Sequence, residues 1–462
     1  MEQVITFVPQ TPAGWLPRLG DAMRRHRGLI QGVQWTVVAF YLMLLVVPAL
    51  RPLPADEARI YNDLTRLAQF VFWGVWWPFV MLSMMLLGRV WCGVFCPEGA
   101  LTEFASRHGL GRAIPRWLRW GGWPFVAFTM TTVYGQLVSV YEYPKAALLV
   151  LGGSTVAAVG VGFVYGRGKR VWCRYLCPAN GVFRLLARLA PVHYRTNAEA
   201  WRRAPRQPAV NCAPLVDLRH LSSAADCHFC GRCSSYRGAV RLAARSPNAE
   251  VLALAADKAS RWEVLLLVYG VLGIAVGAFQ WSASPWFVAF KQTLATWLLD
   301  HEYAALLSDG APWWLLTHYP EANDVFTWLD GMLILGYIGA TAFALGSAVL
   351  LALWGAQRLL ERPGLMWPLA YSLIPLAGIG VFLGLSTLTV AHLRAEGLAL
   401  AWVPVARAVL LAIAVGWSSW LLWRRIAAVH VASLGHRLAA WSAAMTGALP
   451  VLGAWALLFF VW

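Results

Sequence analysis

The chain has 462 residues, of which 59% are hydrophobic and only 13% are charged. A soluble domain usually has about 45–50% apolar and roughly 25% charged residues, so this composition excludes an ordinary soluble protein. The formal net charge is +16. Because the excess of lysine and arginine lies in short loops between apolar runs, it fits membrane topology and anionic lipid headgroups. We therefore expect the lipid bilayer, and no nucleic acid, as a partner.

Apolar runs predict an all-α polytopic membrane protein with about nine transmembrane helices, because a hydrocarbon core of ~30 Å needs about 20 residues per helix. The runs lie near 31–50, 67–88, 121–140, 146–165, 263–283, 328–353, 366–390, 400–422 and 438–461. The first run follows Arg24, Arg25 and Arg27, but it is too long for a signal peptide and no A-x-A cleavage site follows it. We expect this segment to stay in the protein as an anchor.

Basic and acidic loops alternate along this series of spans. The basic ones are the N-terminus, 89–120, 166–262, 354–365 and 424–437. The loops 51–66 and 284–327 are poorer in positive charge, with three arginines against three acids in the first and one lysine against five acids in the second. The positive-inside rule then predicts a multi-pass protein of the inner (cytoplasmic) membrane. Its N-terminus and all cysteine motifs lie in the cytoplasm, and its C-terminus lies in the periplasm.

Four of the eight cysteines form two copies of a W-C-x3-C-P motif, one after the second predicted span and one after the fourth. They are Cys92, Cys96, Cys173 and Cys177. The copies are 81 residues apart, which indicates an internal repeat of two membrane hairpins. A spacing of i, i+4 places both sulfurs of a pair on one face of a helical turn. We expect the four thiolates to converge on a second iron–sulfur centre or another metal or redox site, although buried cysteines can also pack as small apolar side chains.

The other four cysteines lie in the sequences NCAP and CHFCGRC. They are Cys212, Cys227, Cys230 and Cys233. A C-x2-C-x2-C turn is typical of bacterial ferredoxins, but Arg237 and Gly238 stand where the fourth Cys-Pro belongs. Cys212 completes a ligand set for one 4Fe–4S cluster. Two alternatives are a fourth ligand borrowed from Cys96 or Cys177 and a structural zinc. In the reducing cytoplasm, disulfides are rare and thiol clusters bind metals.

The sequence divides into three predicted domains. Residues 1–190 form a four-span membrane domain with the two C-x3-C-P hairpins. Residues 191–260 form a small cytoplasmic, ferredoxin-like iron–sulfur segment, which cannot bury a large core without a metal. Residues 261–462 form a five-span membrane domain of unknown role, and this domain has no cysteine.

Ionisable residues within the C-terminal spans predict a polar membrane site for a quinone headgroup, a proton path or a partner. They are Asp330, His392 and Arg407. A structural Asp330–Arg407 ion pair is the alternative. None of the ten histidines falls in the middle of a span, so we expect no haem. His228 is interpreted as a solvent-facing turn residue, and Glu98 and Glu103 as acids that favour the first turns of a helix.

Two C-x3-C-P motifs and a CHFCGRC segment that continues into GAVRLAARSP resemble the membrane polyferredoxins of the NosR, NapH and CcoG type, over about residues 20–250. The resemblance implies a membrane-bound protein that passes electrons between the quinone pool or a cytoplasmic donor and a respiratory or metalloenzyme-maturation partner. The sequence departs from this pattern in three ways. It lacks a second ferredoxin-type motif. It also lacks a periplasmic flavin-binding domain and an Ig-like tail. In addition, it has five further spans.

Two classes of function follow. In the first, the chain is the electron-transfer component of an oxidoreductase system, with one or two 4Fe–4S clusters and a quinone or a redox protein as partner. In the second, it is a metal-handling or transport protein, for example for copper reduction, with the clusters as reductant or sensor. Transporters usually have broken spans in matching positions of two halves. The C-terminal half has only scattered prolines and charges, which favours electron transfer.

Overall fold

The computed structural model describes residues 14–55, 57–205, 207–429 and 433–462. The N-terminal half is built from helices, several of which are continued by π-helical turns. The helices are α1 (Trp15–Arg25), α2 (Arg27–Ala49), α3 (Leu64–Gln69), α4 (Trp77–Leu87), α5 (Pro97–Arg107), α6 (Trp123–Leu137), α7 (Pro144–Ala147), α8 (Gly153–Tyr165), α9 (Val171–Tyr175) and α10 (Asn180–Ala187). The π-helical segments Phe70–Trp76 and Leu148–Gly152 join α3 to α4 and α7 to α8, and a third, Trp91–Phe95, follows α4.

The segment between the membrane halves contains a small antiparallel sheet. Strand β1 (Val192–Thr196) pairs with β2 (Val240–Ala244), with Val192 opposite Ala244 and Thr196 opposite Val240. Two short helices flank it, α11 (Ala198–Arg203) and α12 (Ala249–Ala253). The loop that carries Cys212 to Cys233 lies between the two strands. Its core is small and includes cysteine side chains themselves (Ala187, Tyr194, Leu221, Cys227, Phe229, Cys233, Val240 and Leu242).

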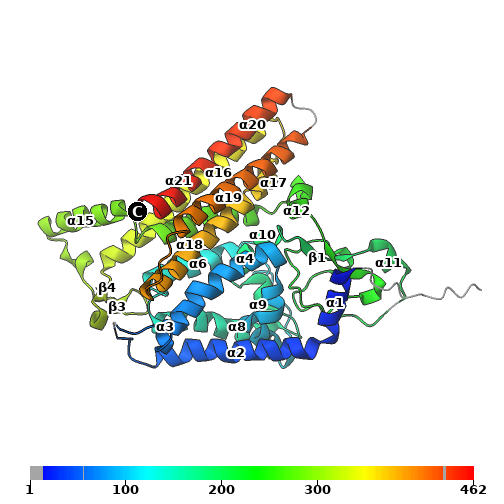
Figure 1. Ribbon diagram of the computed structural model, residues 1–462, viewed down its shortest axis with the longest axis horizontal. Helices are drawn as coiled ribbons and strands as arrows, with labels where there is room; N and C mark the ends of the chain where they lie inside the picture. Colours follow the sequence, from blue (N-terminus) through cyan, green and yellow to red (C-terminus); the bar gives the residue numbers. More distant parts are fainter. Residues whose placement is uncertain (1–13, 56, 206, 430–432) are drawn as a thin grey trace, which may run out of the picture.

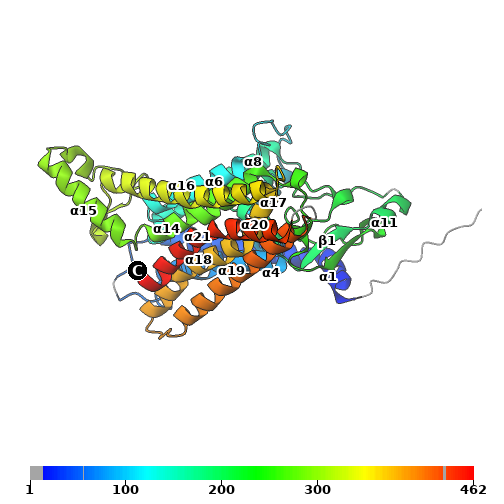
Figure 2. The ribbon, with the colours of Figure 1, turned by 90° about the horizontal axis from the view of Figure 1, so that it is seen from above.

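The C-terminal half adds a second group of long helices. They are α13 (Arg261–Leu265) and α14 (Ala275–Gln280), which the π-helical segment Leu266–Ile274 joins, then α15 (Pro285–Asp300), α16 (Trp328–Leu359), α17 (Met366–Ala370), α18 (Ile374–Ala395), α19 (Val403–Ala427), α20 (Leu434–Thr446) and α21 (Ala448–Ala456). Strands β3 (His318–Tyr319) and β4 (Asp324–Val325) form a second small sheet. Figures 1 and 2 show α1, α11 and β1 at one end of the molecule and α15 at the other.

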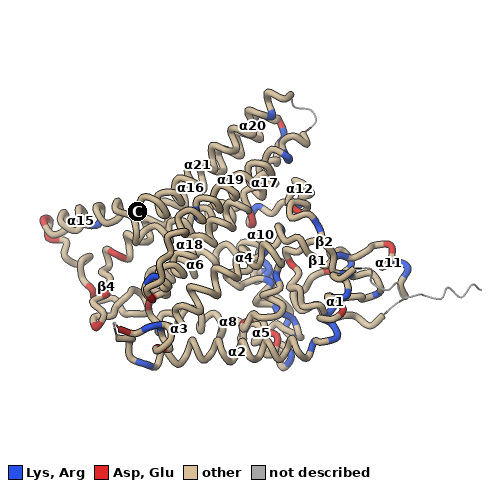
Figure 3. Tube along the Cα trace, viewed as in Figure 1, with Lys and Arg blue, Asp and Glu red and all other residues tan. Residues whose placement is uncertain are grey.

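The two ends of the helix bundle differ in charge. We call the end formed by residues 88–122 and 166–260 the cysteine end, and the end formed by 50–63, 138–143 and 281–327 the opposite end. Lysine and arginine gather around α5, β1 and α11 at the cysteine end, whereas acidic positions mark α15 and β4 at the opposite end (Figure 3). This distribution is the one that the loop charges predicted.

The expected all-α polytopic fold is confirmed, with one correction to the number of long spans. Among the described residues, eight helical segments are long and apolar enough to cross a membrane. The predicted span 121–140 is not one of them, because α6 has 15 residues and is therefore only about 22 Å long. The chain turns after Leu137, where Ser139 adopts a positive φ of 48° and its hydroxyl bonds that of Thr317 at 2.7 Å.

Helix α6 nevertheless runs from one end of the bundle to the other. At the cysteine end, Trp120, just before the helix, packs against Trp262 with ring centroids 4.9 Å apart. At the opposite end, the Leu137 carbonyl accepts a hydrogen bond from the Thr317 amide at 2.8 Å. Both C-x3-C-P motifs consequently lie at the same end, as the repeat requires.

One hydrophobic core joins the two predicted membrane domains. Met84 and Leu186 from the N-terminal half pack in the same cluster as Leu267, Ile374 and Val451 from the C-terminal half. The boundary at residue 260 therefore separates helices that share a core, and the division into domains stays a prediction.

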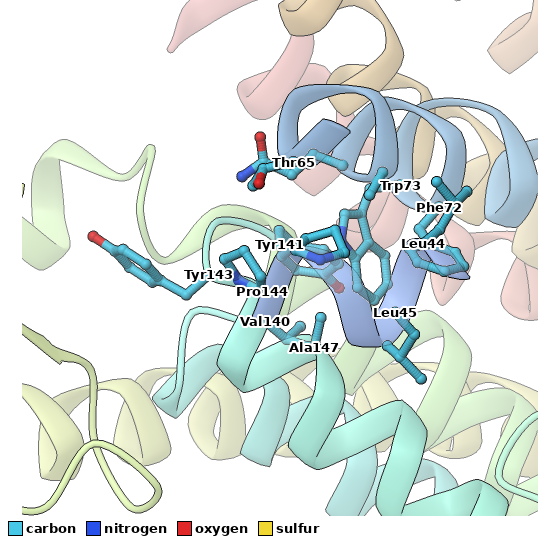
Figure 4. Close-up of a pocket in the computed structure, with 13 residues that line it drawn as sticks. Leu44, Leu45, Thr65, Phe72, Trp73, Val140, Tyr141, Tyr143, Pro144 and Ala147 are labelled. Atoms are coloured by element: carbon cyan, nitrogen blue, oxygen red, sulfur yellow. The ribbon is translucent and has the colours of Figure 1, made fainter. Parts of the chain in front are cut away.

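The opposite end contains a small cavity between α2, the α3 region and the turn before α7 (Figure 4). Trp73 and Tyr141 meet edge to face in it, with ring centroids 4.8 Å apart. Tyr143 points away from this cavity (Figure 4) and donates a hydrogen bond to Asp324 Oδ2 at 2.7 Å. The cavity is lined mainly by apolar side chains, which pack these elements against one another.

Candidate metal centre

The two C-x3-C-P motifs adopt the same backbone turn. In the first, the Cys96 amide donates to the Trp91 carbonyl at 2.9 Å, and in the second the Cys177 amide donates to the Trp172 carbonyl at 3.0 Å. Both hydrogen bonds span five residues, so each cysteine pair sits on one wide helical turn. The internal repeat is thus present in the structure. Cys96 also caps α5, since its Sγ accepts a hydrogen bond from the Gly99 amide at 3.3 Å.

The structure brings the four cysteines of these motifs together, and we call Cys92, Cys96, Cys173 and Cys177 the first set. Burial raises the pKa of the Cys96 thiol well above its ordinary value, and the neighbouring Cys173 and Cys92 raise it further. Burial likewise raises the pKa of Cys173 to about 12, although Arg170 lowers it. Thiols whose pKa is raised in this way need a cationic group nearby to ionise.

The other four cysteines also lie near one another, and we call Cys212, Cys227, Cys230 and Cys233 the second set. Burial raises the pKa of the Cys233 thiol, and Cys227, Cys230 and Cys212 raise it further. Cys212 therefore lies with the C-x2-C-x2-C turn, while Cys96 and Cys177 lie with the first set. Whether Cys212 or a borrowed cysteine is the fourth ligand stays a prediction.

The two sets are in direct contact through Gly93. A Cβ atom at Gly93 would lie 1.8 Å from the His228 carbonyl oxygen and 2.9 Å from the Cys230 amide nitrogen. Only glycine therefore fits at this position, because the loop of the second set packs directly on the turn that carries Cys92. The Gly93 carbonyl accepts a hydrogen bond from Gln34 Nε2 at 2.8 Å, which fixes the turn to α2.

Several arginines lie around both sets. Glu103 accepts hydrogen bonds from Arg107 at 2.8 Å, Arg170 at 2.9 Å and Arg232 at 2.6 Å. Asp226, next to Cys227, pairs with Arg174 at 2.5 Å and Arg184 at 3.3 Å. Five guanidinium groups thus contact these two carboxylates, and among the described residues only Arg184 of the five also pairs with a third, that of Glu263. This surplus of positive charge fits a group that carries negative charge, such as thiolates on an iron–sulfur cluster.

All eight cysteines are free of disulfides. Among the described residues, no three His, Cys, Asp or Glu side chains come close enough together to hold one metal ion. A four-iron cluster is larger than one ion and keeps its thiolate ligands farther apart, so this finding concerns single-ion sites such as structural zinc.

Two residues near the cysteines, His228 and Glu103, are more buried than the sequence suggested, whereas Glu98 lies in the first turn of α5 as expected. His228 is only 2% exposed, and the interpretation as a solvent-facing turn residue is wrong. Burial lowers its pKa well below the ordinary value, and Arg89 and Arg170 lower it further, so the ring is neutral. Glu103 is 4% exposed and holds three arginines, and Glu98 accepts a hydrogen bond from Trp172 Nε1 at 3.1 Å.

The predicted polar membrane site does not form as expected. Asp330 caps its own helix, accepting hydrogen bonds from Thr327, and it pairs with Lys291 rather than Arg407. Arg407 stacks on the ring of Phe459 at 4.8 Å. His392 lies against Phe70, with ring centroids 6.0 Å apart. Within the described ranges, no hydrogen bond or ion pair joins Asp330, His392 and Arg407, because each side chain has found a partner of its own.

Sequence reasoning missed Arg89 and Arg170, which it counted only as loop charges. Each stands three residues before the first cysteine of its motif, in GRVWC and KRVWC. Both are almost fully buried. The signal was available in the repeat itself, since an arginine repeated at the same position beside a cysteine pair indicates a shared role.

The comparisons with known proteins agree with this geometry. A family model described as a 4Fe-4S binding domain matches residues 69–120 and 150–197. The starts of these two matches are 81 residues apart, as are Cys92 and Cys173, and the matches contain the whole first set. They end before Cys212. The chain contains a 4Fe–4S binding domain.

One curated relative is an Escherichia coli (strain K12) protein, YccM, whose name assigns it to electron transport. It is 25% identical over 227 residues, which cover 43% of this chain and 62% of YccM. The chain therefore spans less than two thirds of that relative's length. No solved structure matches the chain.

Together these observations establish a membrane protein with an iron–sulfur cofactor of the 4Fe–4S type. The family match lies on the C-x3-C-P repeats, and the assignment of single cysteines to a cluster stays a prediction.

Proposed function

We propose that this chain is a membrane electron-transfer protein in which the first and second sets each hold a 4Fe–4S cluster. The observation that carries the proposal is the direct contact, at Gly93, between the turn that carries Cys92 and the loop that carries Cys230. When bound, the clusters supply one-electron redox chemistry. The chain itself positions the thiols, buries them from water and surrounds them with guanidinium groups. The name of the relative YccM supports a role in electron transport.

The proposed site of electron transfer is the cytoplasmic face of the inner membrane. The basic loops at the cysteine end support this orientation through the positive-inside rule. Reporter fusions test it: those after Arg112 and Arg362 should report a cytoplasmic position, and those after Pro54 and Ala311 a periplasmic one. A periplasmic report at Arg112 would overturn the orientation.

A quinone is the electron donor or acceptor that the cavities favour. One apolar cavity of ≈ 110 Å³ has Cys96 and Cys177 in its lining. A neighbouring cavity of ≈ 140 Å³ has no cysteine and shares Trp77 and Thr131 with the first. An engineered cavity of about 150 Å³ holds a benzene ring, so the second cavity has the size for a quinone ring. A respiratory or metalloenzyme-maturation protein then completes the chain of electron transfer.

Iron and sulfide analysis tests the proposal. Protein purified anaerobically should contain about eight iron atoms and eight acid-labile sulfides per chain, four of each for every cluster. At least four of each are expected from the first set alone, where the family match lies. Stoichiometric zinc without sulfide would contradict the proposed function.

A further inference from the structure

The repeat places two equivalent arginines beside the cysteines. Arg89 and Arg170 each stand three residues before the first cysteine of their motif, and they are 2% and 1% exposed. In each motif the arginine carbonyl accepts a hydrogen bond from the residue four positions later, Gly93 at 3.3 Å and Arg174 at 3.1 Å. The side chains of Arg89 and Arg170 therefore leave the backbone at equivalent positions of the two repeated turns.

Each arginine reaches into the other repeat. Arg89 Nη2 donates to Asn180 Oδ1 at 2.9 Å. Position 180 lies 81 residues after Gly99, and a Cβ at Gly99 would lie 3.0 Å from Arg170 Nη1. The two guanidinium groups are thus related by the internal repeat, and both lie between its halves.

Each arginine also joins the first set to the second. Arg89 donates to Cys92 Sγ at 3.7 Å and to the carbonyl of Ala225 at 2.9 Å, two residues before Cys227. Arg170 donates to the Cys92 carbonyl, and its amide donates to the carbonyl of Ala213 at 2.8 Å, next to Cys212. The same two residues therefore contact the segments of both cysteine sets.

The charge on these arginines lacks a matching carboxylate. Within the described part of the chain, Arg89 forms no ion pair with Asp or Glu, although it is buried. Arg170 pairs with Glu103, but Glu103 also serves Arg107 and Arg232. A buried cation without a counter-charge is strongly destabilising. Among groups that can carry negative charge, the one that Arg89 contacts directly is the Cys92 thiol, at 3.7 Å.

We propose that Arg89 and Arg170 are positioning residues that hold the two cysteine sets together and raise the reduction potentials of both clusters. This inference rests on the proposed function. Reduction adds negative charge to a cluster, and a buried cation beside it stabilises the reduced form because the surrounding dielectric is low. Net charge and hydrogen bonds to the sulfurs are among the factors that set cluster potentials.

The test is a redox titration of anaerobically purified full-length variants, followed by EPR. Arg89→Gln and Arg170→Gln should move the midpoint potentials of both cluster signals to more negative values. Arg89→Lys should restore most of the wild-type potential, because it keeps the charge. Arg425→Gln is the matched control, since Arg425 is a buried arginine at the same end that donates only to the carbonyls of Val251 and Leu254.

Two further variants keep the test decisive if Arg89→Gln fails to assemble. Lys169 donates to the Cys212 carbonyl at 3.1 Å, so Lys169→Gln should lower the potential of the second-set signal alone. Glu103→Gln removes the shared carboxylate and should raise both potentials.

The outcomes separate this inference from the proposed function. Wild-type protein without iron and sulfide would refute the proposed function itself. Arg89→Gln with full iron and sulfide, and potentials equal to those of Arg425→Gln, would refute the role of the arginine while leaving the electron-transfer function intact. An Arg89→Lys protein whose potentials shift as far as those of Arg89→Gln would show that charge is not the cause, and so would Glu103→Gln with unchanged potentials.

Discussion

The two C-x3-C-P repeats share a backbone turn, but they contact the loop of the second set in different ways. After its first cysteine, the first repeat has Gly93, which packs directly against the loop of the second set. The second repeat has Arg174 at the same position, and this arginine pairs with Asp226 on that loop. One repeat therefore binds the loop by close backbone contact, and the other binds it by charge. The same turn has been adapted to two sides of one loop.

The largest effect is expected where the contact is closest. Gly93→Ala places a methyl group 1.8 Å from a carbonyl oxygen, so the loop must move. Overpacking in a core typically costs about 1–3 kcal/mol, and a clash with backbone is harder to relieve. We expect loss of the second cluster and a strong fall in total iron. Arg174→Ala removes a partly exposed ion pair and should retain most of the iron.

Cys212→Ala tests which thiols belong to the second set. It should halve the iron and sulfide content and remove one EPR signal, while the first-set signal remains. Cys96→Ala is the comparison, since it should remove the first-set signal instead. If Cys212→Ala is silent and Cys96→Ala or Cys177→Ala removes the second-set signal, a borrowed ligand is correct.

Glu103, in the first repeat, predicts that the stability of the folded protein depends on pH. Burial raises the pKa of its carboxyl group, but Arg170 and Arg232 lower it more, so that the pKa falls from an ordinary 4.5 to about 2. A depressed pKa contributes stability above pH 4.5 that is lost as the pH falls towards 2, roughly 3 kcal/mol in total. The free energy of unfolding in detergent, measured from about pH 6 down to about pH 2, covers the range over which this stability is lost.

The control for this pH dependence is Glu199→Gln, because Glu199 is exposed and pairs with Arg203 on the surface. Glu103→Gln should flatten the pH profile, and Glu199→Gln should leave it unchanged. Equal profiles for wild type and Glu103→Gln would mean that the carboxylate does not stabilise the arginines.

The smallest effect concerns the cavities that adjoin the first set. Thr131 lines both of them, so Thr131→Phe should slow reoxidation of the reduced protein by a quinone analogue several-fold without changing the iron content. Thr36→Phe is the matched control, because Thr36 is exposed on α2. Wild-type rates in Thr131→Phe would place quinone contact elsewhere.

Motif spacing and hydropathy predicted much of this molecule. The long helices, the repeat and the grouping of Cys92 with Cys173 follow from patterns that are local or periodic in the chain. The length of α6 did not follow, because the turn at Ser139 is fixed by contacts with Thr317, 178 residues away.

Contacts between residues far apart in the sequence also explain why the partners and burial of some polar residues were predicted wrongly. Asp330 was expected beside Arg407, but its partner is Lys291 on α15, a helix that hydropathy did not reveal. The burial of His228 depends on the packing of its loop against Gly93. Side-chain partners far apart in sequence cannot be read from spacing unless a repeat marks them, as it does for Arg89 and Arg170.

The central claim is that two clusters lie in contact at one end of the bundle. EPR of the fully reduced, anaerobically purified protein tests it most directly, because neighbouring reduced clusters broaden each other's signals. We predict an interaction-broadened spectrum in the wild type, which simplifies to that of one isolated cluster in Cys212→Ala. A simple spectrum in the wild type that Cys212→Ala leaves unchanged would contradict the account.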